Sequence, residues 1–282
     1  MKLLSTQFLV QRVWKLCCLG WGMVVLLSAS SLRADDESLK SQLAVEDEAI
    51  ARSAPNAYRI LYIGDSITRH GTNEGVLKQL GWDHVSGMAA SSEAKDYVHL
   101  LASKIQATLP DRKVEIYFDS QAKKLRPIEP SGLTSGSAQQ KAAMARATAS
   151  FNPHLVVIQL GEHEDATKGP EAFRQSYDQL VTAFAGQKSP PKVICVGVWQ
   201  PGNLGAGQDS YMPTGWAGTL ERVMREVCLT HKIPYASVRP FALDPSCRGV
   251  GKPGVSWHPN DKGMEGYAQV LFEAFEQKST TK

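Results

Sequence analysis

The stretch Arg59-Ile-Leu-Tyr-Ile-Gly-Asp-Ser-Ile-Thr68 is a short apolar run that ends on a glycine and continues with an acid and a hydroxyl. A continuous apolar run of this length is typical of a parallel strand that is buried on both faces. Ligands of open α/β sheets bind just beyond the carboxyl ends of such strands. Ser66 is therefore predicted to lie at the binding edge of an α/β enzyme, with ordinary turn chemistry of Gly-Asp-Ser as the alternative.

Strand-like and helix-like segments alternate along the rest of the chain. Further strands are predicted at 113–118, 155–160, 193–199 and 234–238, and helices at 97–109, 138–150, 170–184, 218–231 and from Asn260 or Asp261 to Phe272. This alternation predicts an α/β fold with a parallel sheet covered on both faces. Because crossovers are right-handed, we expect a flavodoxin-like, three-layer α/β/α sandwich with a central parallel sheet of about five strands.

A histidine lies in the segment that leads into the last predicted helix, residues 257–263 (Trp-His-Pro-Asn-Asp-Lys-Gly). From there it can reach a serine that follows the first strand. Together, Gly64-Asp65-Ser66 and His258-Pro259 resemble the SGNH, or GDSL-type, hydrolases, a family of serine esterases and lipases. The resemblance extends over about 59–275 and implies the same α/β/α fold. It also implies that Ser66 is the nucleophile and that His258 is its general base.

The middle motifs of that family are matched less closely. Gly87 corresponds to the family glycine whose N–H points at the developing oxyanion, beside the N–H of Ser66. Where the family has Gly-x-Asn after a strand, this chain has Gly161-Glu162-His163, so His163 replaces the asparagine of the oxyanion hole. A neutral histidine can still donate one N–H to the hole. By the same resemblance, Asp65 is expected to organise the turn through hydrogen bonds rather than act on substrate.

The family aspartate three residues before the catalytic histidine is Val255 in this chain. A backbone carbonyl can accept the same Nδ1–H bond, which would leave a Ser66–His258 dyad without a buried charge. The nearest alternative acids in sequence are Glu164 and Asp261. Asp261 is expected instead to be an N-cap or first-turn acid of the last helix, a position that the helix dipole favours.

Residues 1–34 have the pattern of an export signal. Basic residues precede the apolar run 16–27, and small residues lead up to Ala34, after which cleavage is predicted. An uncleaved membrane anchor is the alternative, although the apolar run is shorter than the roughly 20 residues that span a bilayer. We expect an exported protein, periplasmic or secreted, without stable membrane insertion after cleavage. A flexible leader at 35–56 would then precede one domain at 57–278.

The positive charge of the chain belongs to this N-terminal segment. Its four basic residues, taken from the 31 Lys and Arg of the whole chain, leave 27 basic residues against 28 Asp and Glu. No basic patch or nucleic-acid-binding motif remains, and the short basic run 123–126 is expected to be a solvated loop. Nucleic acid is therefore not expected as a partner.

Three cysteines lie beyond the export signal: Cys195, Cys228 and Cys247. A disulfide between Cys228 and Cys247 and two free thiols are both compatible with the sequence. The spacings lack the CxxC pattern of a structural zinc site. The cluster Glu162-His163-Glu164-Asp165 is a weak metal candidate, because adjacent residues at a strand end seldom converge on one ion. No metal and no organic cofactor are expected.

The favoured function is hydrolysis of short-chain acyl esters, with a small molecule or a glycan as the acyl carrier. An acyltransferase that uses the same acyl-enzyme is one alternative. A noncatalytic glycan- or partner-binding module is another, supported by Val255 and His163 at the two altered positions. Loops at 68–75, 200–216 and 244–257 are expected to determine specificity. Four aromatic residues of this rim are candidates either for stacking on a sugar or for packing against the core: Trp199, Tyr211, Trp216 and Trp257.

Overall fold

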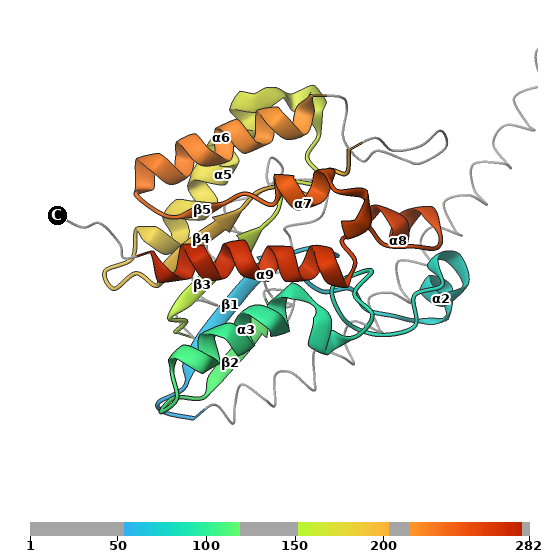
Figure 1. The fold of residues 1–282 in the computed structure, drawn as a ribbon. Helices are drawn as coiled ribbons and strands as arrows, with labels where there is room; N and C mark the ends of the chain where they lie inside the picture. The colour runs from blue at the N-terminus through green and yellow to red at the C-terminus, as the bar shows by residue number, and fades with distance from the viewer. Residues whose placement is uncertain (1–53, 119–151, 203–214, 278–282) are drawn as a thin grey trace, which may run out of the picture. The chain divides into compact units, whose positions relative to one another are not determined.

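The computed structural model of the protein describes residues 54–118, 152–202 and 215–277 (Figure 1). All of them belong to the second of two units, Leu43–Lys282. The predicted export signal at 1–34, the predicted helix at 138–150 and Tyr211 lie outside the described residues. Within the described part of the chain, no helix has both the length and the apolar character needed to cross a membrane.

The predicted parallel sheet is present, and the fold is the expected α/β sandwich. Its strands are β1 (Tyr58–Gly64), β2 (Val114–Phe118), β3 (Leu155–Gln159), β4 (Lys192–Val196) and β5 (Tyr235–Ala236). All neighbouring strands pair in parallel, in the order β2-β1-β3-β4-β5. This is the flavodoxin-like order, in which the connections reverse direction between β1 and β3. Ligands are therefore expected at the carboxyl ends of these two strands.

Helices cover both faces of the sheet. They are α2 (Glu74–Leu80), α3 (Tyr97–Thr108), α5 (Gly169–Ala185), α6 (Trp216–His231), α7 (Arg239–Leu243), α8 (Pro253–Trp257) and α9 (Asp261–Glu276), with 3-10 turns η1 (Glu93–Lys95), η5 (Ala166–Lys168) and η6 (Pro245–Cys247). In Figure 1, α3 and α9 lie together on one face of the sheet, and α5 and α6 lie together on the other.

Alternating residues of β1 feed two separate apolar clusters. Ile60 and Tyr62 pack with buried residues of α3 and α9. Leu61 and Ile63 pack with buried residues of α5 and α6. Each of these four side chains is no more than 1% exposed. The continuous apolar run of β1 is thus explained by burial on both faces of the strand.

Short helices occupy parts of the loops that the sequence predicts at the rim. Asn73 caps α2 by accepting the Val76 N–H, and Gly81 ends that helix in the left-handed region, at φ 70. The predicted loop at 244–257 contains η6 and α8. Helices of five to seven residues are too short to show a helical period in sequence.

The structure decides two alternatives that the sequence leaves open, namely the state of the cysteines and the role of the tryptophans at the rim. Cys195, Cys228 and Cys247 are buried free thiols, so the Cys228–Cys247 disulfide is not formed in this structure. Trp199 and Trp257 are buried in the α3/α9 cluster, and Trp216 is buried in the α5/α6 cluster. These three tryptophans pack against the core and do not offer a face to a sugar.

Candidate active site

The turn after β1 presents Ser66 at the carboxyl edge of the sheet. A Cβ on Gly64 would lie 1.9 Å from Thr68 Oγ1, so the close return of the chain requires a glycine. Asp65 organises this turn as expected. Its carboxylate accepts the Ile67 N–H at 3.3 Å, and its carbonyl accepts the N–H groups of Thr68 and Arg69, each at 2.9 Å.

His258 meets Ser66 from the far end of the chain. Ser66 Oγ lies 2.8 Å from His258 Nε2, across 192 residues of sequence. His258 is the C-cap of α8. Two residues later, Asn260 caps α9 by accepting the Gly263 N–H. The Trp199 indole N–H donates to the Trp257 carbonyl at 2.7 Å and thereby anchors the residue before the histidine.

The other ring nitrogen of His258 is held by the backbone of the same short helix. His258 Nδ1 lies 2.6 Å from the carbonyl oxygen of Gly254. A carbonyl oxygen only accepts, so Nδ1 carries the proton and Nε2 is left as the acceptor for the Ser66 hydroxyl. This is the arrangement that the sequence offers as a substitute for the missing family aspartate.

No acid takes over that position from elsewhere in the described chain. Val255 is buried in a small apolar cluster with Trp82 and Met88. Asp261 accepts hydrogen bonds from the Ser91 N–H and hydroxyl and from Lys95, in the first turn of α9. It is therefore a first-turn acid, while Asn260 is the cap.

Burial makes His258 a weak base. The side chain is 4% exposed, and its burial lowers the pKa of His258 to about 3. The nearby rings of His70 and His163 lower it further, whereas the bond to the Gly254 carbonyl acts in the opposite direction. The imidazole is therefore neutral at ordinary pH, which is the state that a general base needs.

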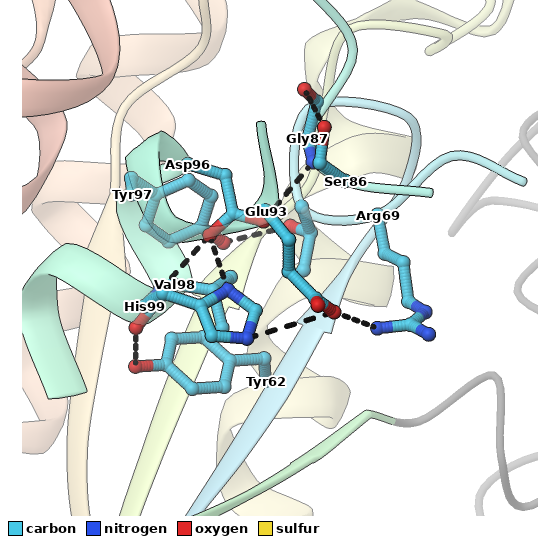
Figure 2. Close-up of polar contacts among 10 residues, drawn as sticks. Tyr62, Arg69, Ser86, Gly87, Glu93, Asp96, Tyr97, Val98 and His99 are labelled. Atoms are coloured by element: carbon cyan, nitrogen blue, oxygen red, sulfur yellow. Dashed lines mark hydrogen bonds and ion pairs between the residues drawn. The ribbon is translucent and has the colours of Figure 1, made fainter. Parts of the chain in front are cut away.

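Two of the donors predicted for the oxyanion hole are engaged by carboxylates. The Gly87 N–H donates to Asp96 Oδ2 at 3.2 Å, and Asp96 also binds the N–H and Nδ1 of His99 (Figure 2). His163 Nε2 lies 3.5 Å from Asp65 Oδ2. Both groups therefore contact a carboxylate in this structure, and their role in an oxyanion hole stays a prediction. Gly161, which positions His163, has φ 136, a conformation that favours glycine.

Charged contacts extend from Asp96, the residue that accepts the Gly87 N–H, through His99 and Glu93 to Arg69. Glu93 lies 3.5 Å from Arg69 and 3.7 Å from His99 Nε2, as Figure 2 shows. Burial acts to lower the pKa of His99, but the bond to Asp96 and the charges of Asp96 and Glu93 raise it overall. The carboxylates of Asp96 and Glu93 therefore favour the protonated form of His99.

Beneath the site, a buried polar network joins the ends of β1, β3 and β4. The Gln159 amide and the Trp199 N–H both donate to Glu162 Oε1, at 2.8 and 2.7 Å. Thr68 donates to Gln159 Oε1 at 3.0 Å, so the Tyr97 hydroxyl, 2.7 Å away, donates to Thr68. Burial raises the pKa of Glu162 well above its ordinary value, and the charge of Asp65 adds to the shift.

The cluster at residues 162–165, a weak metal candidate in the sequence, has its side chains engaged in other contacts. Glu162 turns inward to the network, His163 faces Asp65, and Asp165 caps the η5 turn. Over residues 54–118, 152–202 and 215–277, no group of three or more His, Cys, Asp or Glu side chains could hold a metal ion.

Sequence reasoning expected a backbone carbonyl beside His258 but did not identify Gly254, and it missed Asp96 as a partner of Gly87. Gly254 acts through its carbonyl, which every residue type carries, so no residue pattern marks it. Asp96 could have been noticed as the capping acid before the predicted helix at 97–109, because Asp is a preferred N-cap. Its additional bond to Gly87 depends on the tertiary fold.

A parallel α/β/α sandwich with a hydrogen-bonded Ser–His pair at the carboxyl ends of its strands is the arrangement of an SGNH-type hydrolase. The chain belongs to the GDSL-like lipase/acylhydrolase family, whose model matches residues 62–265. Membership of this family supports an ester-hydrolysing enzyme. A comparison with curated proteins yields no match.

Solved structures share the fold at low sequence identity. The acetylxylan esterase Axe2 from Geobacillus stearothermophilus is 15% identical, with a TM-score of 0.50 over 78% of this chain and 95% of its own. The acetyl xylan esterase AlAXEase is also 15% identical, with a TM-score of 0.50 over 77% and 98% of the two chains. A two-domain esterase active on acetylated mannans is 19% identical, with a TM-score of 0.49, and the match covers 85% of this chain but only 54% of that one.

Proposed function

We propose that this protein is an exported serine esterase that hydrolyses short-chain acyl esters through an acyl-Ser66 intermediate, with acylated carbohydrates as the leading substrate class. The observation that carries the proposal is the pair of hydrogen bonds on His258, 2.8 Å from Nε2 to Ser66 Oγ and 2.6 Å from Nδ1 to the Gly254 carbonyl. Together they orient the ring and leave Nε2 able to accept the hydroxyl proton.

The reaction would proceed as a two-step acyl transfer. His258 takes the Ser66 proton while Oγ attacks the ester carbonyl, and His258 then gives that proton to the departing alcohol. A water molecule, activated by the same nitrogen, hydrolyses the acyl-enzyme. The Ser66 N–H stabilises the oxyanion first. Gly87 and His163 join it when they exchange their carboxylate contacts for the substrate oxygen.

A noncatalytic binding module is a second candidate, and a specific observation favours it. Both Gly87 and His163 contact an acidic side chain, so the oxyanion hole is incomplete without a rearrangement. An acyltransferase would use the same acyl-enzyme with an alcohol in place of water. Activity measurements separate the three functions.

The central experiment is hydrolysis of p-nitrophenyl acetate by the purified protein and by its Ser66→Ala variant. Ser189→Ala is the matched control, because Ser189 is exposed in the connection from α5 to β4, at the opposite edge of the sheet. Turnover lost only in Ser66→Ala supports the esterase. Equal turnover in all three proteins refutes Ser66 as nucleophile, and no turnover in any of them favours the binding module.

Three further measurements address the substrate, acyl transfer and the location of the protein. Release of acetate from acetylated xylan and mannan oligosaccharides tests the carbohydrate class, since several proteins of this fold are named for such substrates. An acceptor alcohol added to the same assay tests acyl transfer. Mass spectrometry of the exported form should give a chain that begins at Asp35.

A further inference from the structure

We infer that Leu80 of α2 is a positioning residue for the catalytic histidine, because it fixes α8 and thereby the Gly254 carbonyl that orients His258. The inference deepens the proposed function and rests on it for its catalytic consequence. The family places an aspartate side chain where this chain has Val255, so the orientation of the ring depends here on the position of a short helix.

The first observation is the distance between α2 and α8 at Gly254. A Cβ on Gly254 would lie 2.9 Å from Leu80 Cδ2, closer than real Cβ atoms approach other heavy atoms. The other two nearest atoms to that position also belong to the Leu80 side chain. Leu80 is therefore packed directly against α8 at Gly254, and a methyl group at this position would require the Leu80 side chain or α8 to move.

Two further contacts hold the pair of helices together. The Lys252 ammonium donates to the Lys78 carbonyl at 2.6 Å, in the last turn of α2, where carbonyls lack partners within the helix. Beside this bond, Leu80 packs against the buried cluster of Trp82, Met88 and Val255. α8 has only five residues, so its position depends on tertiary contacts: these with α2, and the bond from Trp199 to the Trp257 carbonyl at its other end.

The geometry of α8 reaches His258 directly. Gly254 lies four residues before the histidine, and His258 is the C-cap of α8. A shift of α8 away from α2 would change the 2.8 Å distance from His258 Nε2 to Ser66 Oγ, and a distortion of α8 would change the 2.6 Å distance from the Gly254 oxygen to Nδ1. Misplacement of a catalytic group by about 1 Å can reduce the rate by about 10²-fold.

The test is a pair of complementary size changes in the full protein. Gly254→Ala places a methyl group against Leu80 Cδ2, so that α8 or the Leu80 side chain must move, and Leu80→Ala removes the contact that holds α8. In the double variant the new methyl group fills the space that Leu80 leaves. We expect kcat to fall by about 10²-fold in Gly254→Ala with little change in KM, and to recover most of this loss in the double variant.

Gly218→Ala is the matched control, since a Cβ at that position of α6 meets no atom within 4 Å. The direct readout is the NMR signal of the His258 Nδ1 proton, which does not require activity. This signal should be sharp in the wild type and in Gly218→Ala. In Gly254→Ala and in Leu80→Ala the proton should exchange faster with solvent, and in the double variant its slow exchange should return.

The outcomes separate this inference from the proposed function. Absence of Ser66-dependent turnover overturns the esterase, while the Nδ1 signal still tests the positioning role of Leu80. An unchanged signal in a folded Gly254→Ala protein, or a loss that Leu80→Ala does not repair, overturns the inference. If Gly254→Ala does not fold, unchanged proton exchange in Leu80→Ala overturns it equally.

Discussion

Hydrolysis should persist in acid, because the base is buried. Burial lowers the pKa of His258 to about 3. A group with that pKa is ~99% neutral at pH 5, whereas a histidine with the ordinary pKa of about 6.5 is only ~3% neutral. Since kcat/KM reports the ionisation of the free enzyme, it should change by less than about twofold between pH 7 and pH 5. With an exposed imidazole of ordinary pKa as the base, kcat/KM would fall about 25-fold over the same interval.

Phenyl acetate is the suitable substrate for this measurement, because phenol does not ionise in the range examined. Ser66→Ala gives the background rate at each pH, and circular dichroism at each pH shows whether the protein remains folded. A fall in kcat/KM with an apparent pKa of about 6 to 7, in a protein that stays folded, would refute the neutral buried base.

The remaining predictions concern stability. Below its ordinary pKa of about 6.5, His258 binds a proton in the unfolded chain but not in the folded one, so stability is lost as the pH falls from about 6.5 towards 3. From pH 7.5 to pH 5, the wild type should lose about 2 kcal/mol more unfolding free energy than His258→Gln. Equal losses in urea titrations at the two pH values would contradict this. Val255→Asp should cost about 3 kcal/mol or more, because it places a carboxyl in an apolar cluster, while Val250→Asp, at an 86% exposed site, should be nearly neutral. Asp96→Asn should cost about 1 to 3 kcal/mol, since the amide keeps only one of the two oxygens that accept from Gly87 and His99, so that one set of these bonds is lost; an unchanged urea midpoint would show that the lost bonds contribute nothing.

The long elements of the fold could be predicted because they carry a clear period. The α9 helix starts within one residue of its predicted position, at Asp261, and the strand after 152 begins at Leu155 as predicted. The flavodoxin-like sandwich also followed from the alternation of strands and helices and from the right-handedness of crossovers. The folded structure then brings Ser66 to His258, although their catalytic roles remain predictions.

The supporting contacts could not be predicted in the same way. The helices α2 and α8 are short and are held by tertiary contacts such as Leu80 against Gly254, which leave no periodic signal. The bond from Gly87 to Asp96 depends on how two loops meet after folding. Backbone groups and loop contacts are therefore the part of this site that a single sequence hides.

The carbonyl of Gly254 affects which chemical step limits the rate. It bears a partial charge only, so no full negative charge lies beside the ring when His258 becomes an imidazolium. A base of such low pKa is the conjugate of a strong acid, which makes removal of the Ser66 proton difficult and protonation of the departing alcohol easy. Attack on the carbonyl should then limit turnover. Across a series of esters, rates should follow the electrophilicity of the acyl group and depend only weakly on the alcohol that leaves.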